Sequence, residues 1–140
     1  RKALNARAER AQAMSEVVAS VGEVVHRAAE GDFTGRVQVV ADDPSLRALA
    51  DGINRINAVV DEATGDFERV LKAIAEGDLV QDVNRDYRGR LDQLKTAINR
   101  TANRLSTAVA TIQRTAQEVQ VSSTEIKTGA DDLAQRTEQQ

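Results

Sequence analysis

Ala29-Glu30-Gly31-Asp32-Phe33 returns about 46 residues later as Ala75-Glu76-Gly77-Asp78-Leu79, and these two stretches decide the fold. Downstream of each, an Ile-Asn-Arg triplet recurs, at residues 53–55 and again at 98–100. The second triplet follows its Glu-Gly-Asp sequence one residue sooner than the first does, because the segment between them is shorter. Self-similarity at a fixed spacing marks a duplicated structural unit. The sequence therefore predicts two copies of one unit.

The composition indicates long helices rather than a compact core. Among 140 residues there is no Trp and one Pro, and the aromatic residues are Phe33, Phe67 and Tyr87. A single chain therefore lacks the bulky side chains that usually fill a globular core. Aliphatic and charged residues dominate, as in helices that bury a narrow stripe against partner helices. We expect an all-α protein whose folded form contains more than one chain.

Charge and cysteine content argue against several classes of protein. The formal net charge is −3, and charges of both signs are spread along the chain, so we expect no nucleic-acid partner. The absence of Cys excludes disulfides and thiol chemistry and fits a cytoplasmic segment. No apolar run approaches the roughly 20 residues that span a bilayer. The start at Arg1 resembles that of an excised segment, so the parent protein can still be anchored in the inner membrane.

Apolar residues recur three and four positions apart, which predicts three helical stretches. The first stretch precedes Gly31, with residues 1–13 as a helical lead-in. The second continues unbroken across Gly65 as one helix of about 29 residues. In the third, a large aliphatic side chain recurs every seven residues, which predicts left-handed supercoiling. The expected bundle core comprises Val17, Val21, Val24, Leu46, Leu49, Ile53, Ile56, Val60, Phe67, Val70, Ile74, Leu91, Leu94, Ile98, Leu105 and Ile112.

Two connectors, at about residues 31–44 and 77–89, are expected between these helices. Gly31 and Gly77 suit the left-handed conformation that ends a helix. Each glycine precedes an apolar pair that we expect to anchor the connector on the bundle: Phe33 with Val37, and Leu79 with Val83. Asp43 and Pro44 form a helix start signal, whereas the second restart, near residues 87–90, has no clear cap.

The connector length sets the expected topology. About 13 extended residues are enough to return along a helix of about 15 residues, so the two helices of a copy can be parallel. A lone parallel pair would leave apolar surface exposed. Two chains that form parallel homodimeric four-helix bundles would bury that surface, and the third helix would continue as a coiled-coil stalk.

The arrangement resembles a HAMP signalling domain: a helix, a Gly-led connector with two apolar anchors, and a second helix containing Ile-Asn-Arg. The resemblance covers residues 14–62 and 66–107. The tandem arrangement is similar to that of bacterial methyl-accepting chemotaxis proteins, and residues 108–140 resemble the start of their signalling helix. The resemblance implies an intracellular relay that converts input at the N-terminal helix into packing changes of two coupled bundles. These changes would control a downstream stalk that regulates a kinase.

The resemblance also implies partners and one modification site. In the full-length receptor, the partners would be a chemotaxis histidine kinase and a coupling protein at the distal stalk, and a receptor methyltransferase and methylesterase. In this family, adaptation uses Glu or Gln pairs on an exposed helix face. Glu138-Gln139 matches such a pair and makes Gln139 the candidate for deamidation and methylation.

Other chemistry is weakly supported. His26 lacks the acidic neighbour and nearby Pro expected of a phosphoacceptor, and a single His with scattered carboxylates does not form a metal site. The two Glu-Gly-Asp sequences are better explained as helix ends than as paired acids. Asn54-Arg55 and Asn99-Arg100 recur at equal places, which favours hydrogen bonds to helices or connectors over a binding role. We expect no catalytic residue, no metal and no cofactor.

Two other functions stay open on the sequence alone. HAMP relays also occur as linkers in sensor histidine kinases and nucleotide cyclases, and this chain could be such a linker. A purely structural coiled coil is the third hypothesis.

Overall fold

A computed structural model describes residues 1–39 and 42–139. It contains helices α1 (Lys2–Ala29), α2 (Pro44–Ala75) and α3 (Gly89–Glu138), and the described residues form no strand. The all-α prediction is therefore confirmed. The chain divides into two units, Arg1–Arg69 and Val70–Gln140, which are described separately below.

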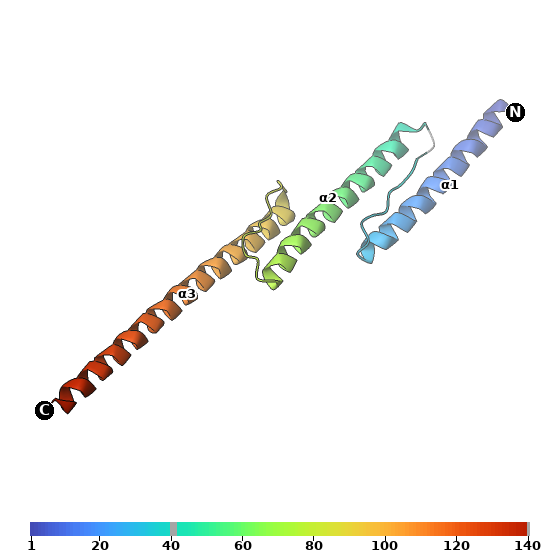
Figure 1. The fold of residues 1–140 in the computed structure, drawn as a ribbon. Coiled ribbons are helices and arrows are strands. Elements are labelled where there is room, and N and C mark those ends of the chain that lie inside the picture. The colour runs from blue at the N-terminus through green and yellow to red at the C-terminus, as the bar shows by residue number, and fades with distance from the viewer. Residues whose placement is uncertain (40–41, 140) are drawn as a thin grey trace. The chain divides into compact units, whose positions relative to one another are not determined.

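In the first unit, α1 and α2 run in the same direction, and the first connector returns between their ends (Figure 1). Its small core contains Val24 of α1, Val37 of the connector and Ala50 of α2, all at most 4% exposed. Val21, Val39 and Ile53 pack against this cluster. The connector is therefore part of the core of this unit and not a solvated loop. Residues 40–41 of the expected connector lie outside the described residues.

The helices before both connectors end in the same hydrogen-bonded turn. Gly31 and Gly77 have φ angles of 95° and 86°, a region that a side chain makes costly. Asp32 and Asp78 donate their backbone N–H groups to carbonyls five residues back, at 2.9 and 2.8 Å. The glycine N–H groups bond three residues back, both at 3.0 Å. This pattern is a Schellman motif, which satisfies carbonyls that the helix end leaves free.

The starts of α2 and α3 differ. The Asp43 carboxylate accepts a hydrogen bond from the Ser45 backbone N–H at 2.9 Å, and Pro44 takes the first helical position. The helix start predicted at Asp43 and Pro44 is therefore confirmed. At α3, Arg88 makes no side-chain cap, and Gly89 adopts a φ angle of 57°. Since α2 runs through Gly65 without a break, the predicted absence of a loop there is confirmed as well.

The second unit repeats the arrangement of helix, connector and helix, with the chain returning beside the start of α3 (Figure 1). Val70, Val83 and Ala102 are its buried apolar residues, each at most 2% exposed. From residue 103 to residue 139, all described side chains of this chain are exposed. None of the described helices combines the length and hydropathy that crossing a membrane requires.

Candidate functional site

Each connector is held to the helix that follows it by one asparagine, in an arrangement that we call the connector clamp. In the first copy, the Val37 N–H donates to Asn54 Oδ1 at 2.6 Å, and Asn54 Nδ2 donates to the Val37 carbonyl at 2.9 Å. In the second copy, Val83 and Asn99 form the same two bonds, both at 2.8 Å. The predicted hydrogen-bonding role is confirmed for both asparagines.

The clamp has a simple physical basis. An extended connector leaves backbone N–H and C=O groups without partners, and burial makes such groups costly unless they are hydrogen-bonded. A primary amide offers one donor and one acceptor side by side, so it matches both groups of a single residue. The clamped residues, Val37 and Val83, are 4% and 1% exposed. Each clamp thus fixes a buried valine and its backbone at the same point.

The predicted connector residues are buried to different extents. Val37 and Val83 are buried, whereas Phe33 and Leu79, the other members of the anchor pairs, are half-buried. The glycines that begin the connectors, Gly31 and Gly77, lie at the turns described above.

Sequence analysis missed a second asparagine in the first copy. Asn57 lies one turn beyond Asn54 on α2, is 3% exposed, and donates through Nδ2 to the Gly35 carbonyl at 3.0 Å. Alignment of the two copies places Ala102, which is 2% exposed, at the corresponding position of α3. A polar residue three positions after the clamp asparagine and on its face was the available signal.

A second missed contact joins the start of the first connector to α1. Arg27 donates through Nη2 to Asp32 Oδ2 at 2.7 Å, and the Thr34 hydroxyl donates to Asp32 Oδ1 at 2.6 Å. The Thr34 backbone N–H bonds the same oxygen at 3.0 Å. The hydrogen bonds from Thr34, together with Arg27, lower the pKa of Asp32 from 3.8 to about 2. The carboxylate stabilises the turn in its charged form.

In the second copy, a lysine holds the far end of the connector. Lys95 of α3 donates through Nζ to the Arg85 carbonyl at 2.9 Å, and it lies 3.9 Å from a carboxylate oxygen of Asp86. The Lys95 side chain is only 18% exposed, whereas Asp86 is fully in solvent. The carbonyl bond therefore carries most of this contact, because exposed ion pairs contribute little. The aligned position in the first copy is Ala50, a core residue.

The predicted bundle core divides into two groups. One group is buried or half-buried within the chain: Val17, Val21, Val24, Leu46, Ile53, Val60, Phe67, Val70, Ile74, Leu91 and Ile98. The other group is 40% to 66% exposed: Leu49, Ile56, Leu94, Leu105 and Ile112. The exposed group belongs to the same three-four pattern as the buried one. A single chain therefore covers only part of its apolar stripe.

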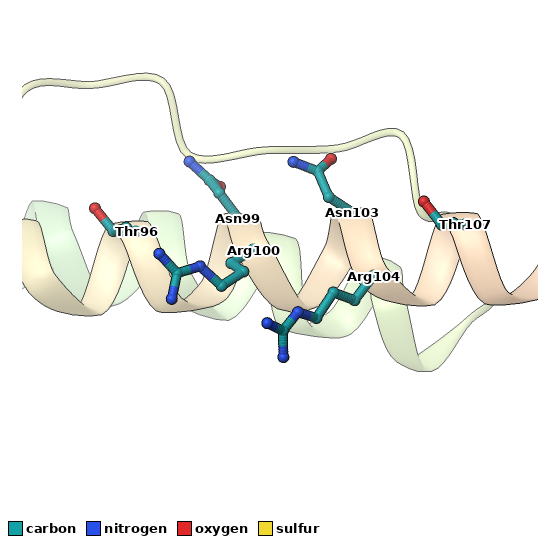
Figure 2. A pocket seen from close by; sticks show the side chains of 6 residues that line it. All are labelled: Thr96, Asn99, Arg100, Asn103, Arg104 and Thr107. Atoms are coloured by element: carbon teal, nitrogen blue, oxygen red, sulfur yellow. The ribbon is translucent and has the colours of Figure 1, made fainter.

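A shallow hollow on α3 does not offer the chemistry of a reaction site. It is lined by Thr96, Asn99, Arg100, Asn103, Arg104 and Thr107. Figure 2 shows Asn99 and Asn103 pointing to one side of α3 and Arg100 and Arg104 to the other. These residue types include no general base or thiol nucleophile. Within residues 1–39 and 42–139, no three His, Cys, Asp or Glu residues lie together as metal ligands would.

The two remaining candidates lie at helix ends. His26, in the last turn of α1, is 3.3 Å from Glu30, and both side chains are largely exposed. Gln139 caps α3 and is exposed, with its backbone N–H bonded to the Gln135 carbonyl at 3.3 Å. Gln140, which ends the motif that resembles an adaptation segment, lies outside the described residues.

The family comparison covers the second copy and the helix before it. Residues 45–107 match the family described as HAMP domain, and this range includes α2, the second connector, its clamp and the first turns of α3. The chain carries a HAMP domain. In this protein, the HAMP domain thus consists of two helices joined by a connector, which begins with a Schellman turn and is held by an asparagine clamp.

The chain is also similar to one curated chemotaxis protein. The chain is 36% identical to methyl-accepting chemotaxis protein McpB of Pseudomonas aeruginosa over 99 residues, which is 71% of this chain. It spans 15% of that relative's length. No solved structure is significantly similar to the chain.

Proposed function

We propose that this chain is the signal relay of a methyl-accepting chemotaxis protein and that it works as a parallel homodimer without enzymatic activity of its own. The likeness to a chemotaxis protein supports the receptor assignment over a kinase or cyclase linker. Two HAMP copies, residues 14–62 and 66–107, would lead from an N-terminal lead-in to the start of a signalling helix at residues 108–140.

One observation carries this proposal: the apolar stripe of α3 is exposed among the described residues of the chain. Beyond residue 103, a large aliphatic side chain recurs every seven residues, and each is 40% to 72% exposed; the five are Leu105, Ile112, Val119, Ile126 and Leu133. Most of the stability of a protein helix comes from packing rather than from propensity, so we expect a helix of 50 residues, about 75 Å long, to pack along this stripe. A second copy in register would cover this stripe, since a seven-residue repeat favours a left-handed coiled coil.

The same argument extends to the bundles. Leu49 and Ile56 of α2 are 50% and 62% exposed, although Ala50 and Asn57, each the next residue along, are 3% exposed. One face of α2 therefore packs inside its own chain, and the adjacent face carries uncovered apolar groups. A second chain that brings the same faces would complete a four-helix bundle, with an interface that repeats each contact by symmetry.

The connector contacts would transmit a displacement of one helix to the next. Arg27 of α1 holds the start of the first connector through Asp32, while Asn54 and Asn57 of α2 hold its middle. Displacement of α1 would therefore pull on the connector and on α2 and bias the bundle between two packing arrangements. In the second copy, the Asn99 clamp would pass the change to α3.

Partners, modification and location follow from the proposed receptor. A chemotaxis histidine kinase and a coupling protein would bind the distal stalk. A methyltransferase and a methylesterase would act on Gln139, which is exposed next to Glu138. Loss of negative charge on neighbouring helices would favour tighter packing. The segment would be cytoplasmic, in a parent protein anchored in the inner membrane.

Disulfide crosslinking tests the dimer, because the chain has no native Cys. Thr115 lies on the proposed seam of α3, three positions after Ile112, and Gln117 lies on the opposite face. In a parallel in-register dimer, we expect Thr115→Cys to crosslink rapidly, since seam residues approach within the 7 Å between Cα atoms that a disulfide tolerates.

Gln117→Cys is the matched control, because it is equally exposed and less than one turn away. It should crosslink slowly. Equal rates for the two variants would contradict the proposed seam. If a cysteine near the start of α3 crosslinks only to one near its end, the assembly is antiparallel.

A further inference from the structure

We propose that Thr64 and Gly65 form a soft point in α2, at which the helix bends or opens locally and so limits how strictly the two HAMP copies move together. Its role in signal coupling rests on the relay proposed above, whereas the local softness is a property of α2 alone. The soft point is defined as residues 64 and 65.

Gly65 weakens the helix without a packing reason to be there. It lies in the interior of α2 without a positive φ angle, and a Cβ built on it would meet no atom within 4 Å. Alanine would therefore fit within this chain. Compared with alanine, glycine lowers the equilibrium constant for local helix formation about fivefold, because its backbone loses more freedom on folding.

Thr64 adds a second, independent weakening. Its hydroxyl lies 2.8 Å from the Val60 carbonyl and 3.1 Å from the Asp61 carbonyl, so it competes for acceptors of the helical hydrogen bonds. Threonine and serine that bond back to the preceding turn in this way often bend a helix. Helix kinks concentrate at such polar residues and at glycine.

The neighbouring residues bury one face of the helix, and Thr64 and Gly65 lie on its exposed face. Ala63, Phe67 and Val70 are 0%, 8% and 0% exposed, whereas Thr64 and Gly65 are exposed. A helix held along its buried face bends most easily through its solvent face, where carbonyls can turn outward to water. The exposed side of this segment is the side that carries the soft point.

The soft point lies where it can affect coupling between the two copies. Thr64 and Gly65 fall between the two HAMP copies, residues 14–62 and 66–107, and close to the boundary between the two compact units after Arg69. α2 is the helix that both copies share. A stiff helix would transmit a rotation of α2 in one copy fully to the other copy. A soft point would absorb part of that rotation by local bending.

Amide hydrogen exchange of the chain tests the local claim. We expect protection factors at residues 66–69, whose acceptors lie in the turn around the soft point, to be at least about fivefold lower than those at residues 57–60, whose acceptors at 53–56 include no glycine. Gly65→Ala should raise the protection at 66–69 about fivefold, and Thr64→Val should raise it further. Gly52→Ala is the control, because Gly52 is also helical and free of contacts, and it should leave residues 66–69 unchanged.

The coupling claim uses the two clamp amides as reporters. Asn54→Ala should lower protection of the Val37 amide severalfold and change that of the Val83 amide by less than twofold. When Gly65→Ala is added, the effect at Val83 should grow to at least threefold. Equal protection along α2, or an effect at Val83 that Gly65→Ala leaves unchanged, would overturn the proposal. Neither readout depends on crosslinking at Thr115, so failure of the relay would be seen separately.

Discussion

The two connectors share their turn, buried valine and clamp, and they differ in further contacts. Both begin with a Schellman turn, both carry a buried valine, and both are clamped by an asparagine of the following helix. The first copy adds Arg27 and Asn57, where the aligned second-copy residues are Ala73 and Ala102. The second copy adds Lys95 at the opposite end of the connector, where the first has Ala50.

This difference separates what each copy of the duplicated unit needs from what it can vary. The turn and the clamp satisfy backbone groups that would otherwise be buried without partners, a requirement that both copies face. The variable contacts hold different parts of the connector: the first connector is tied near its start, and the second near its end. The duplicated unit thus keeps its fold while each copy holds its connector in its own way.

The largest expected effect comes from a charge at the shared anchor. Val37→Asp and Val83→Asp should each lower the free energy of unfolding by about 3–5 kcal/mol, because each buries an unpaired carboxylate. Urea unfolding followed by circular dichroism, at one fixed protein concentration, measures this loss. If one variant is tolerated, that connector is not docked as described, and the two copies are less alike than the clamp indicates.

Removal of the clamp should have the next largest effect. Asn54→Ala and Asn99→Ala should each cost about 1–3 kcal/mol, since each leaves a buried N–H and a buried C=O without a partner. The neighbouring arginines provide matched controls: Arg55→Ala and Arg100→Ala should stay within about 0.5 kcal/mol, as both side chains are exposed. A cost confined to one of the two asparagines would show that the clamp is not a shared requirement.

A contact unique to the first copy should matter less. Asn57→Ala should cost about 1 kcal/mol, the usual net contribution of one hydrogen bond, because it removes the single bond to the Gly35 carbonyl. It should also raise hydrogen exchange in the first connector. Asn103→Ala, which changes an exposed asparagine of α3, is the control and should be silent. Equal losses for both variants would mean that burial of Asn57 has no energetic consequence.

The smallest effect concerns the charged turn of the first copy. The pKa of Asp32 is about 2 in the folded chain, below its ordinary value of 3.8. The charged carboxylate therefore favours folding above about pH 4, and this contribution is lost as the pH falls through 2. A carboxyl NMR titration should show a midpoint near 2, and Thr34→Val should move it upward. A midpoint at 3.8 in the unaltered chain would refute the hydrogen-bonded turn.

Much of this architecture follows from short-range rules that the sequence displays. Three-four spacing of apolar residues predicts all three helices, and the glycines after Ala-Glu predict both helix ends, because only glycine readily adopts the required φ angle. Asp43-Pro44 predicts the start of α2. Duplication strengthens the prediction of both helix ends, since a feature that recurs at the same place has a structural cause.

The contacts that sequence analysis missed depend on how the connector folds back. Asn57 looks like an ordinary polar residue of a helix until the Gly35 carbonyl is placed beside it, 22 positions away in sequence. Arg27 and Lys95 likewise reach backbone or turn atoms that no periodicity locates. The exposed members of the predicted core show the converse: Ile56 and Ile112 obey the helical pattern, but they are 62% and 66% exposed in the single chain.

The most direct test of the central claim is the mass of the chain in solution. Sedimentation equilibrium should give twice the 15.2 kDa of one chain at micromolar concentration, because we propose that a second copy covers the exposed stripe from Leu105 to Leu133. Ile112→Asp, which places a charge in that stripe, should shift the equilibrium toward a single chain. A mass of 15.2 kDa at high concentration, with α3 still helical, would contradict the account.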